Sequence, residues 1–362
     1  MAKLDVDALK SALTSAGASW IAAETAMTAL SNDEMRLRLG AEPPVGEAAL
    51  FDREQAATAT LKTARSKAAA AAAAAWDWRS VGGANYLAAP RDQKTCGSCV
   101  AFGTIAAIEG TTRFNAKNAG LNFDLSEAHL FYCHGAADGR NCGNGWWPSK
   151  ALDAAKAKGI VDEACFPYVP GDQACKPCVD AVARTTKIKS WTSLQNAEAM
   201  KTWISTKGPV VACFTVYSDF QAYHGGIYRH VSGDQLGGHC VCVVGYSDAD
   251  KAWIARNSWG PGWGEGGYFR IGYGEVGIDY EMWGVDVDAK PVVNDVIKLE
   301  KVQITGLWAN NAATMTQAYV DKLGWRKLPS ADFVTLAATA RTARAPCTIS
   351  IKGDTIIELY VM

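Results

Sequence analysis

Of all residues in this sequence, Cys99 has the surroundings that most clearly favour a reactive side chain. It ends the segment QKTCGSC, residues 93–99, and an apolar run that favours a helix, residues 100–109, follows it directly. The first N–H groups of a helix are unpaired and the helix dipole places partial positive charge beside them, so a thiol at this position is stabilised as a thiolate. A buried or disulfide-bonded cysteine is the alternative interpretation, because the chain has 11 cysteines.

Two residues further along the chain carry the groups that a nucleophilic thiol needs. His239 stands at the start of an apolar run of strand length, residues 240–246, and Asn257 ends a second strand pattern where a turn rich in glycine and tryptophan begins. Alone, each has an ordinary structural interpretation, as a core histidine and as a turn asparagine. Together with Cys99 they supply a nucleophile, a base that takes and returns its proton, and a partner that orients the base.

From Trp76 to about Asp286 the chain resembles the papain-like cysteine peptidases. His239 and Asn257 follow Cys99 by 140 and 158 residues, which suits that family. The resemblance rests on these motifs: Asp77-Trp78-Arg79, Gln93, the CGSC of residues 96–99, Leu125-Ser126-Glu127, Gly208-Pro209-Val210, Gly238-His239 and Asn257-Ser258-Trp259-Gly260. It implies an α+β fold of papain type with two lobes, a helical left lobe and a β-barrel-like right lobe. The implied activity is that of a cysteine endopeptidase, which hydrolyses peptide bonds through a covalent acyl-enzyme.

The resemblance also implies a role for each residue of the site. Cys99 would be the nucleophile and His239 the acid and base, paired as thiolate and imidazolium. Asn257 would be the hydrogen-bond partner of the imidazole, and Trp259 would shield this pair from water. The Gln93 side-chain amide and the Cys99 backbone N–H would donate to the tetrahedral oxyanion.

The expected substrate is a peptide or protein bound in an extended conformation. By the same resemblance, Gly145 would offer backbone groups to the substrate strand, a form of β-augmentation. The main specificity pocket would be formed by Trp146, Trp147, Pro148, Cys213, Gly237 and Gly238. No ionic side chain is expected there, so we predict an apolar side chain at the P2 position of the substrate. Ordinary core packing is the alternative for the two tryptophans, and the stretch from Cys142 to Ala151 is one residue longer than in papain.

Most of the other cysteines are candidates for disulfides. The resemblance implies bridges from Cys96 to Cys142 and from Cys133 to Cys175, and Cys165 and Cys178 suggest a third. Sequence alone does not fix this connectivity. Cys213, Cys240 and Cys242 fall in apolar strand segments and suit a buried position better than a metal site, so we expect no metal and no other cofactor.

Composition and charge bear on location and partners. Disulfides imply an oxidising compartment, which slightly favours an extracellular location. Residues 1–7 are too polar and too acidic for a secretory signal, so the localisation stays open. The net charge of −1 and the lack of a long apolar run indicate neither a nucleic-acid partner nor a membrane span. We expect a monomer.

Three domains are expected, of which the first is a helical pro-segment over residues 1–75. Its sequence predicts helices over residues 4–16 and 31–40 and an alanine-rich helix over residues 47–75. We expect this pro-segment to cover the cleft of a zymogen as an intramolecular inhibitor. A flexible spacer or a helical docking arm is the alternative.

A peptidase domain over residues 76–289 and a small α+β accessory domain over residues 290–362 complete the expected organisation. In the accessory domain we predict a strand, two helices and a hairpin, over residues 296–305, 312–323, 331–341 and 347–361. This domain has two interpretations, a module that binds substrate or partner and an appendage that stabilises the peptidase.

Two other functions remain compatible with this sequence. A catalytically silent binding protein could use the same scaffold, although the nucleophile, base, orienting amide and oxyanion donor are all present. A transpeptidase or ligase would use the same acyl-enzyme with an amine in place of water.

Overall fold

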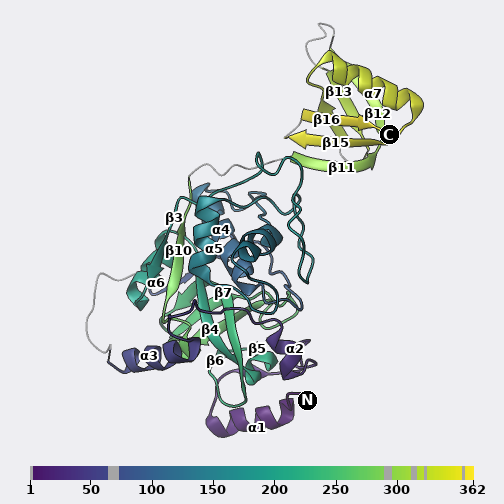
Figure 1. Cartoon of the computed structure of the whole chain (residues 1–362). Coiled ribbons are helices and arrows are strands. Elements are labelled where there is room, and N and C mark those ends of the chain that lie inside the picture. Colours follow the sequence, from purple (N-terminus) through teal and green to yellow (C-terminus); the bar gives the residue numbers. More distant parts are fainter. Residues whose placement is uncertain (1–2, 64–72, 289–295, 311–315, 322–323, 353–354) are drawn as a thin grey trace. The chain divides into compact units, whose positions relative to one another are not determined.

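The structure is a computed structural model of the chain. It describes residues 3–63, 73–288, 296–310, 316–321, 324–352 and 355–362. The chain divides into two compact units, Met1–Val292 and Val293–Met362, which Figure 1 shows coloured along the sequence. This division falls close to the boundary that we predict after residue 289.

The central helix of the larger unit is α4 (Cys99–Asn115), which begins at Cys99 and contains the predicted run of residues 100–109. This helix is buried along most of its length and lies close to a strand, since a Cβ on Gly103 would be only 3.1 Å from the Cys240 sulfur. α5 (Pro148–Ala157) packs against α4 and against the π-helix η1 (His129–Gly135). The remaining helices of the core are α6 (Ala197–Thr206) and the short 3-10 turns η2 (Ser218–Ala222) and η3 (Glu275–Gly277).

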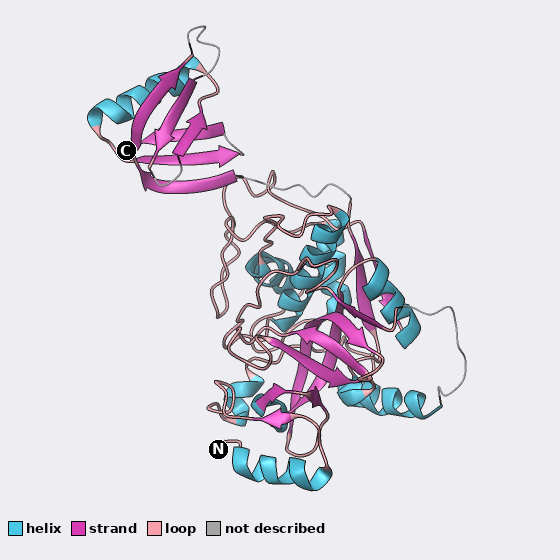
Figure 2. Cartoon of the chain, turned by 180° about the vertical axis from the view of Figure 1, so that it is seen from behind, coloured by secondary structure: helices cyan, strands magenta, loops and turns pink. Residues whose placement is uncertain are grey.

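One mixed sheet forms the other half of the core, and Figure 2 shows its strands together from behind. The strands are β2 (Ala75–Asp77), β3 (Ser190–Leu194), β4 (Val210–Tyr217), β6 (Ile227–Tyr228), β7 (Gln235–Ser247), β8 (Ala252–Arg256), β9 (Tyr268–Gly272) and β10 (Met282–Asp286). They pair in the order β3-β10-β4-β7-β8-β9-β6, and β2 pairs with β7. The central strand β4 is buried on both faces over nearly its whole length.

The predicted α+β class and papain-like fold are confirmed, and the sheet of the lobe expected to be barrel-like is not a closed barrel. β3 and β6 stand at the two ends of the strand order, and no pairing joins them within the residues that the structure describes. β6 has only two residues, both used in its parallel pairing with β9. Closing a sheet requires its end strands to pair, so this sheet is open.

The N-terminal segment lies against the strands of the larger unit (Figure 1). α1 (Val6–Ala16) begins after Asp5, whose carboxylate accepts from two helix N–H groups, and it ends at Gly17 in the left-handed conformation. β1 (Ile21–Ala22) then pairs with β5 (Tyr223–Gly225).

Two further helices follow in this segment. α2 (Asn32–Arg36) begins with a capping box, because the side chains of Ser31 and Glu34 each bond the backbone N–H of the other. Of the helix predicted over residues 47–75, α3 (Leu50–Thr63) is helical and residue 75 begins β2. Part of the alanine run lies outside the described residues.

The smaller unit contains a second sheet with one helix on it. Its elements are β11 (Val296–Val302), β12 (Ile304–Ala309), β13 (Thr316–Val320), β14 (Gly324–Lys327), α7 (Ala331–Ala343), β15 (Cys347–Lys352) and β16 (Thr355–Val361). The strands pair in the order β11-β15-β16-β14-β13-β12. α7 and the hairpin of β15 and β16 lie where the sequence predicts them, although the tip of the hairpin falls outside the described residues.

The helix predicted over residues 312–323 is wrong in its described part. β13 is a strand paired with β12 and β14. Ala318 and Val320 are fully buried and Tyr319 between them is exposed, which is the alternation of a strand with one covered face.

None of the described helices of the chain is long and apolar enough to cross a membrane.

Three disulfides join the cysteine pairs that were expected from the sequence. Cys96 is bonded to Cys142, Cys133 to Cys175 and Cys165 to Cys178. Cys165 and Cys178 also form, with Asp180, the only described group with the spacing of metal ligands. Both sulfurs are held in the disulfide, so neither is a thiolate ligand.

Candidate active site

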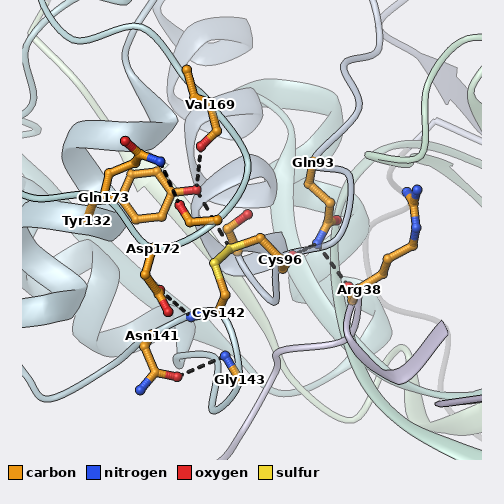
Figure 3. Close-up of a disulfide and its surroundings, with 12 residues drawn as sticks. Arg38, Gln93, Cys96, Tyr132, Asn141, Cys142, Gly143, Val169, Asp172 and Gln173 are labelled. Atoms are coloured by element: carbon orange, nitrogen blue, oxygen red, sulfur yellow. Dashed lines mark hydrogen bonds between the residues drawn. A yellow bond between two sulfur atoms is a disulfide. The ribbon is translucent and has the colours of Figure 1, made fainter. Parts of the chain in front are cut away.

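A disulfide holds the loop that precedes α4. The Cys96–Cys142 bridge is supported by a hydrogen bond from the Gly97 N–H to the Cys142 carbonyl at 2.9 Å, and Figure 3 shows the bridge beside Gln93. Cys99 is the first residue of α4. Its sulfur therefore belongs to the end of the helix where N–H groups are unpaired, as the sequence predicts.

His239 and Asn257 come from neighbouring strands of the sheet, within β7 and directly after β8. The His239 Nε2 and the Asn257 Oδ1 are 2.8 Å apart, and the same oxygen accepts from the Ser258 N–H at 2.8 Å. Because a carbonyl oxygen only accepts, Nε2 carries the proton and Nδ1 is left as an acceptor. Nδ1 makes no hydrogen bond to any described residue.

Trp259 packs beside this pair. The centres of the Trp259 and His239 rings are 4.9 Å apart, and both side chains are buried. The expected shield over the imidazole is therefore present as a contact between rings, which keeps water from the His239–Asn257 hydrogen bond.

The side-chain amide of Gln93 is fully buried, and both its nitrogen and its oxygen are hydrogen-bonded. Its Nε2 donates to the Cys96 carbonyl at 2.8 Å and to the Arg38 carbonyl at 2.9 Å (Figure 3). Its Oε1 accepts from the Ser258 hydroxyl at 2.5 Å. The donor that we expect for a substrate oxyanion is thus engaged with a carbonyl of the N-terminal segment.

Residues 38–42, called the covering segment below, cross the site through backbone hydrogen bonds. The Trp146 N–H donates to the Gly40 carbonyl at 2.8 Å, and the Glu42 N–H donates to the Trp146 carbonyl at 3.0 Å. From the sheet, the Gly238 carbonyl accepts from the Ala41 N–H at 3.0 Å. The covering segment therefore bridges the helical and the β half of the core in the way an added strand does.

Glycines allow this close approach. A Cβ on Gly145 would lie 2.1 Å from the Gly40 carbonyl oxygen, and a Cβ on Gly40 would lie 1.9 Å from the Gly97 carbonyl oxygen. Gly145 was expected to supply backbone groups to an extended strand, but Trp146 supplies them to the covering segment. This shift by one residue fits the extra residue in the stretch after Cys142.

Burial under the covering segment changes the protonation of the site. Cys99 and His239 have no exposed surface. Burial raises the pKa of the Cys99 thiol well above its usual value, although backbone N–H groups that include that of Gly40 oppose the shift. Burial lowers the pKa of His239 to about 4, against the hydrogen bond of Asn257. Near neutral pH both groups are uncharged, so the expected thiolate–imidazolium pair is not the state of this covered form.

Two residues predicted for the specificity pocket, Trp147 and Cys213, lie near a carboxylate that sequence reasoning missed. Glu281 accepts from the Ser193 hydroxyl at 2.6 Å and from Arg53 of α3 at 3.0 Å. Burial raises the pKa of the Cys213 thiol, and the charges of Arg53 and Glu281 act on it in opposite directions. The prediction of a pocket without an ionic side chain stays a prediction, and Glu281 is a charged group close to one of its residues, Cys213. A single glutamate before a strand carries no signal that could have found it.

Comparisons with known proteins agree with this geometry. The family described as "Papain family cysteine protease" matches residues 72–285. "Cysteine proteinase 1" of Entamoeba histolytica is 37% identical over 54% of this chain and 62% of that protein, and "Cathepsin B-like CP3" of Giardia intestinalis is 36% identical over 53% and 68%. The chain thus spans about two thirds of the length of these relatives.

Solved structures of proenzymes are similar to the chain over a longer stretch. One described as "proCathepsin B S9 from Trypanosoma congolense" has a TM-score of 0.63 and 25% identity, covering 80% of this chain and 100% of that chain. The digestive procathepsin L2 proteinase of Tenebrio molitor has a TM-score of 0.61 and 26% identity over 78% of this chain and 89% of that chain. With the family matched over more than half of its length, this chain belongs to the papain family of cysteine proteases.

Proposed function

We propose that this chain is the zymogen of a cysteine endopeptidase that hydrolyses peptide bonds in peptides or proteins. The proposal is supported by the His239–Asn257 hydrogen bond, by the hydrogen bond of the Gln93 amide to the covering segment, and by the position of Cys99 at the start of α4. We assign residues 1–75 to the pro-segment, residues 76–289 to the peptidase domain and residues 290–362 to the accessory domain. The similarity to proenzymes supports this assignment.

Catalysis begins once a substrate replaces the covering segment. His239 takes the Cys99 proton at Nδ1, the nitrogen left without a partner, and the thiolate attacks the substrate carbonyl carbon. The C–N bond breaks as His239 returns the proton to the leaving amine. Water then attacks the thioester with His239 as base, which releases the acid product and restores the thiol.

Asn257 and Gln93 assist this sequence without changing covalently. Asn257 holds the imidazole in the tautomer that leaves Nδ1 free to accept the proton. The Gln93 Nε2 and the Cys99 N–H would bind the oxyanion, and loss of one such donor typically lowers kcat by about 100- to 1,000-fold.

The contacts of the covering segment support its role as an inhibitor. The carbonyl bound by Gln93 belongs to Arg38, whereas the backbone N–H that acts on the Cys99 thiol belongs to Gly40. Attack requires one carbonyl group to meet both the thiol and the oxyanion donor. The covering segment engages the two with different residues, which explains how it occupies the site without being a good substrate.

Substitution of the nucleophile and the base tests the proposal. Full-length Cys99→Ala and His239→Ala chains should have no activity on casein or a peptide library after the wild type has become active. Cys242→Ala removes a buried thiol outside the site and is the matched control. Activity that survives in either active-site variant would falsify the proposal.

Two measurements separate the alternatives. An epoxide thiol inhibitor should label Cys99 of the active wild type, whereas a silent binding protein would not react. Added amine should leave the hydrolysis products largely unchanged, whereas a transpeptidase would form the amine adduct.

A further inference from the structure

Two thiols that the proposed mechanism does not use face each other across two strands. Cys213 of β4 and Cys240 of β7 stand directly opposite in the antiparallel ladder, and both are free. Opposite residues of such a ladder have side chains on the same face and Cα atoms about 4.5–5.5 Å apart. A disulfide spans Cα separations of about 4.4–6.8 Å. The register of the sheet therefore holds this pair at a separation that a disulfide can join.

The pair is enclosed between the sheet and α4, beside the catalytic thiol. Cys213 is 3% exposed, and Cys240 has no exposed surface. A Cβ on Gly103 of α4 would lie only 3.1 Å from the Cys240 sulfur, so the glycine leaves the space that this sulfur fills. The Cys240 backbone N–H also favours the Cys99 thiolate, against the larger effect of burial. Cys240 is therefore a neighbour of both Cys213 and the nucleophile.

The two thiols of the pair are not equivalent. Burial raises the pKa of both. The hydrogen bond between them lowers the pKa of Cys213 and raises that of Cys240, because the Cys240 S–H donates to the Cys213 sulfur. Cys213 is therefore the thiol that becomes a thiolate first, and Cys240 keeps its proton longer.

The N-terminal segment covers the same face of the sheet next to this pair. Gly238 stands two residues before Cys240 and so points to the same face of β7. A Cβ on Gly238 would lie 2.1 Å from Cδ1 of Leu50 in α3 and 2.2 Å from the carbonyl oxygen of Ala41 in the covering segment. Departure of the pro-segment therefore uncovers the pair from this side, and Cys213 is already the more exposed thiol.

We propose that Cys213 and Cys240 form a redox-active dithiol, which glutathione disulfide converts to a cross-strand disulfide once the pro-segment has left. The Cys213 thiolate attacks one sulfur of the oxidant, and a mixed disulfide forms as one glutathione leaves with the proton that Cys213 lost. The Cys240 sulfur then attacks the Cys213 sulfur, and the second glutathione leaves with the Cys240 proton. Two protein thiols are oxidised, and one glutathione disulfide is reduced to two glutathiones.

This dithiol goes beyond the proposed function, and only its exposure on activation rests on that function. The test maps the thiols of the full-length wild type after its activity has become constant. The enzyme is equilibrated with glutathione buffers from reducing to oxidising, the remaining thiols are alkylated in denaturant, and unreduced peptides are identified by mass spectrometry. We expect Cys213 and Cys240 to be joined in oxidising buffer and alkylated again after return to reducing buffer. Cys99 is followed in its own peptide.

Cys242 supplies the matched control. It lies in the same strand as Cys240, is 1% exposed and stands opposite Val211 instead of a cysteine. The disulfide to Cys213 should persist in Cys242→Ala, which also leaves Cys240 as the one thiol of a peptide that the two cysteines share. It should be lost in Cys240→Ala. Should Cys240→Ala not fold, the mapping of Cys242→Ala still decides.

Full-length Cys99→Ala, which keeps the covering segment, tests the exposure on activation. Its pair should oxidise at least about ten times more slowly than that of the active enzyme, and equal rates would refute protection by the pro-segment. The dithiol itself is refuted if Cys213 stays alkylated in the most oxidising buffer, or is recovered only as a glutathione adduct. If the wild type neither becomes active nor binds an epoxide, the proposed function is wrong. A Cys213–Cys240 disulfide formed on prolonged oxidation would then still support the dithiol, and its absence would refute it.

Discussion

The N-terminal segment contacts the core in two regions that use different means. The covering segment crosses Cys99 mainly through backbone groups, with Gly40, Ala41 and Glu42 bonded to Trp146 and Gly238. Helix α3 is instead anchored by charged side chains: Arg53 lies between a carboxylate and two rings, and Glu54 accepts from the Tyr217 hydroxyl at 3.2 Å. The first contact depends on how closely two backbones approach, and the second depends on charge.

This difference separates two tasks that a single inhibitory segment performs. Backbone hydrogen bonds are available to almost every sequence, so the covering segment blocks the site without specifying side chains, provided that glycine stands where the chains meet. A buried ion pair accepts few substitutes, because a lone charge left behind is strongly unfavourable.

Gly40→Ala should have the largest effect. The new Cβ would lie 1.9 Å from the Gly97 carbonyl oxygen and 2.6 Å from its carbonyl carbon, and both are backbone atoms of a loop held by a disulfide. We expect a cost of about 3 kcal/mol to the covered form, and thus roughly 100-fold faster epoxide labelling of Cys99 in the full-length chain.

Gly120→Ala is the control for this experiment. Its Cβ would meet only the Asn118 side chain at 3.7 Å, an ordinary contact. Equal labelling rates for Gly40→Ala and the wild type would contradict the close packing of the covering segment.

The second largest effect is expected from acid, which should destabilise the covered form. The covered form holds the pKa of His239 at about 4, below its usual value of 6.5. Its neutral imidazole contributes fully to the covered form above pH 6.5, and this contribution is lost as the pH falls from 6.5 toward 4, by up to about 3 kcal/mol. In a Cys99→Ala chain, hydrogen exchange of residues 38–42, corrected for its intrinsic pH dependence, should report this loss of protection.

The control for acid opening is a chain without the titrating imidazole. A Cys99→Ala chain that also carries His239→Gln should show a clearly smaller change between pH 7 and pH 4. Protection that does not depend on pH in the single variant would refute the role given to the buried imidazole.

Arg53→Met should loosen the second contact by a smaller amount. The substitution keeps the packing volume of the side-chain stem but leaves Glu281 without its cation, so we expect about 2 kcal/mol of loss. Epoxide labelling of the full-length chain should rise roughly 30-fold. Arg36→Met is the control, since the Arg36–Asp33 pair is exposed and should change labelling little. A larger effect for Arg36 than for Arg53 would be incompatible with a buried anchor.

Asn32→Ala should have the smallest effect of the four. Its side chain joins the N-terminal segment to the core by an exposed hydrogen bond to Asp234 at 3.1 Å and by a long one from the Gln221 amide at 3.4 Å. Water replaces such a partner at little cost, so we expect less than about 1 kcal/mol and less than about fivefold faster labelling. An effect as large as that of Gly40→Ala would show that α2, and not the covering segment, controls access.

Local signals predicted the parts of the site that lie on single elements. The start of α4 follows from the apolar run after Cys99, and the positions of His239 in a strand and of Asn257 at the end of one follow from their flanking glycines and turns. His239 and Asn257 meet because β7 and β8 are neighbours in the sheet. Only the resemblance to a known family predicted this contact, because the spacing of the two residues in the sequence does not show which strands pair.

What the sequence did not predict depends on contacts between distant segments. Arg53 and Glu281 are separated by 228 residues, and neither stands in a motif, so only the fold brings them together. The covering segment likewise reads as the end of the helix predicted over residues 31–40, but α2 ends at Arg36 and Gly40 instead meets Gly97 and Gly145. Residues 316–320 mixed alanine and polar residues in a way that suited a helix, and the neighbouring strands β12 and β14 decided the outcome.

The two bonds between Gln93 and Ser258 have a mechanical consequence. Beside the side-chain contact, the Gln93 N–H donates to the Ser258 carbonyl at 3.0 Å, and the Gly260 N–H donates to the Arg91 carbonyl at 3.0 Å. These bonds, with the isolated antiparallel bridge of Asp92 and Trp259, join the stretch that leads to Cys99 to the stretch that follows Asn257. We therefore expect the two halves of the site to keep their spacing when the covering segment departs, so that access to the thiol does not need a hinge between them.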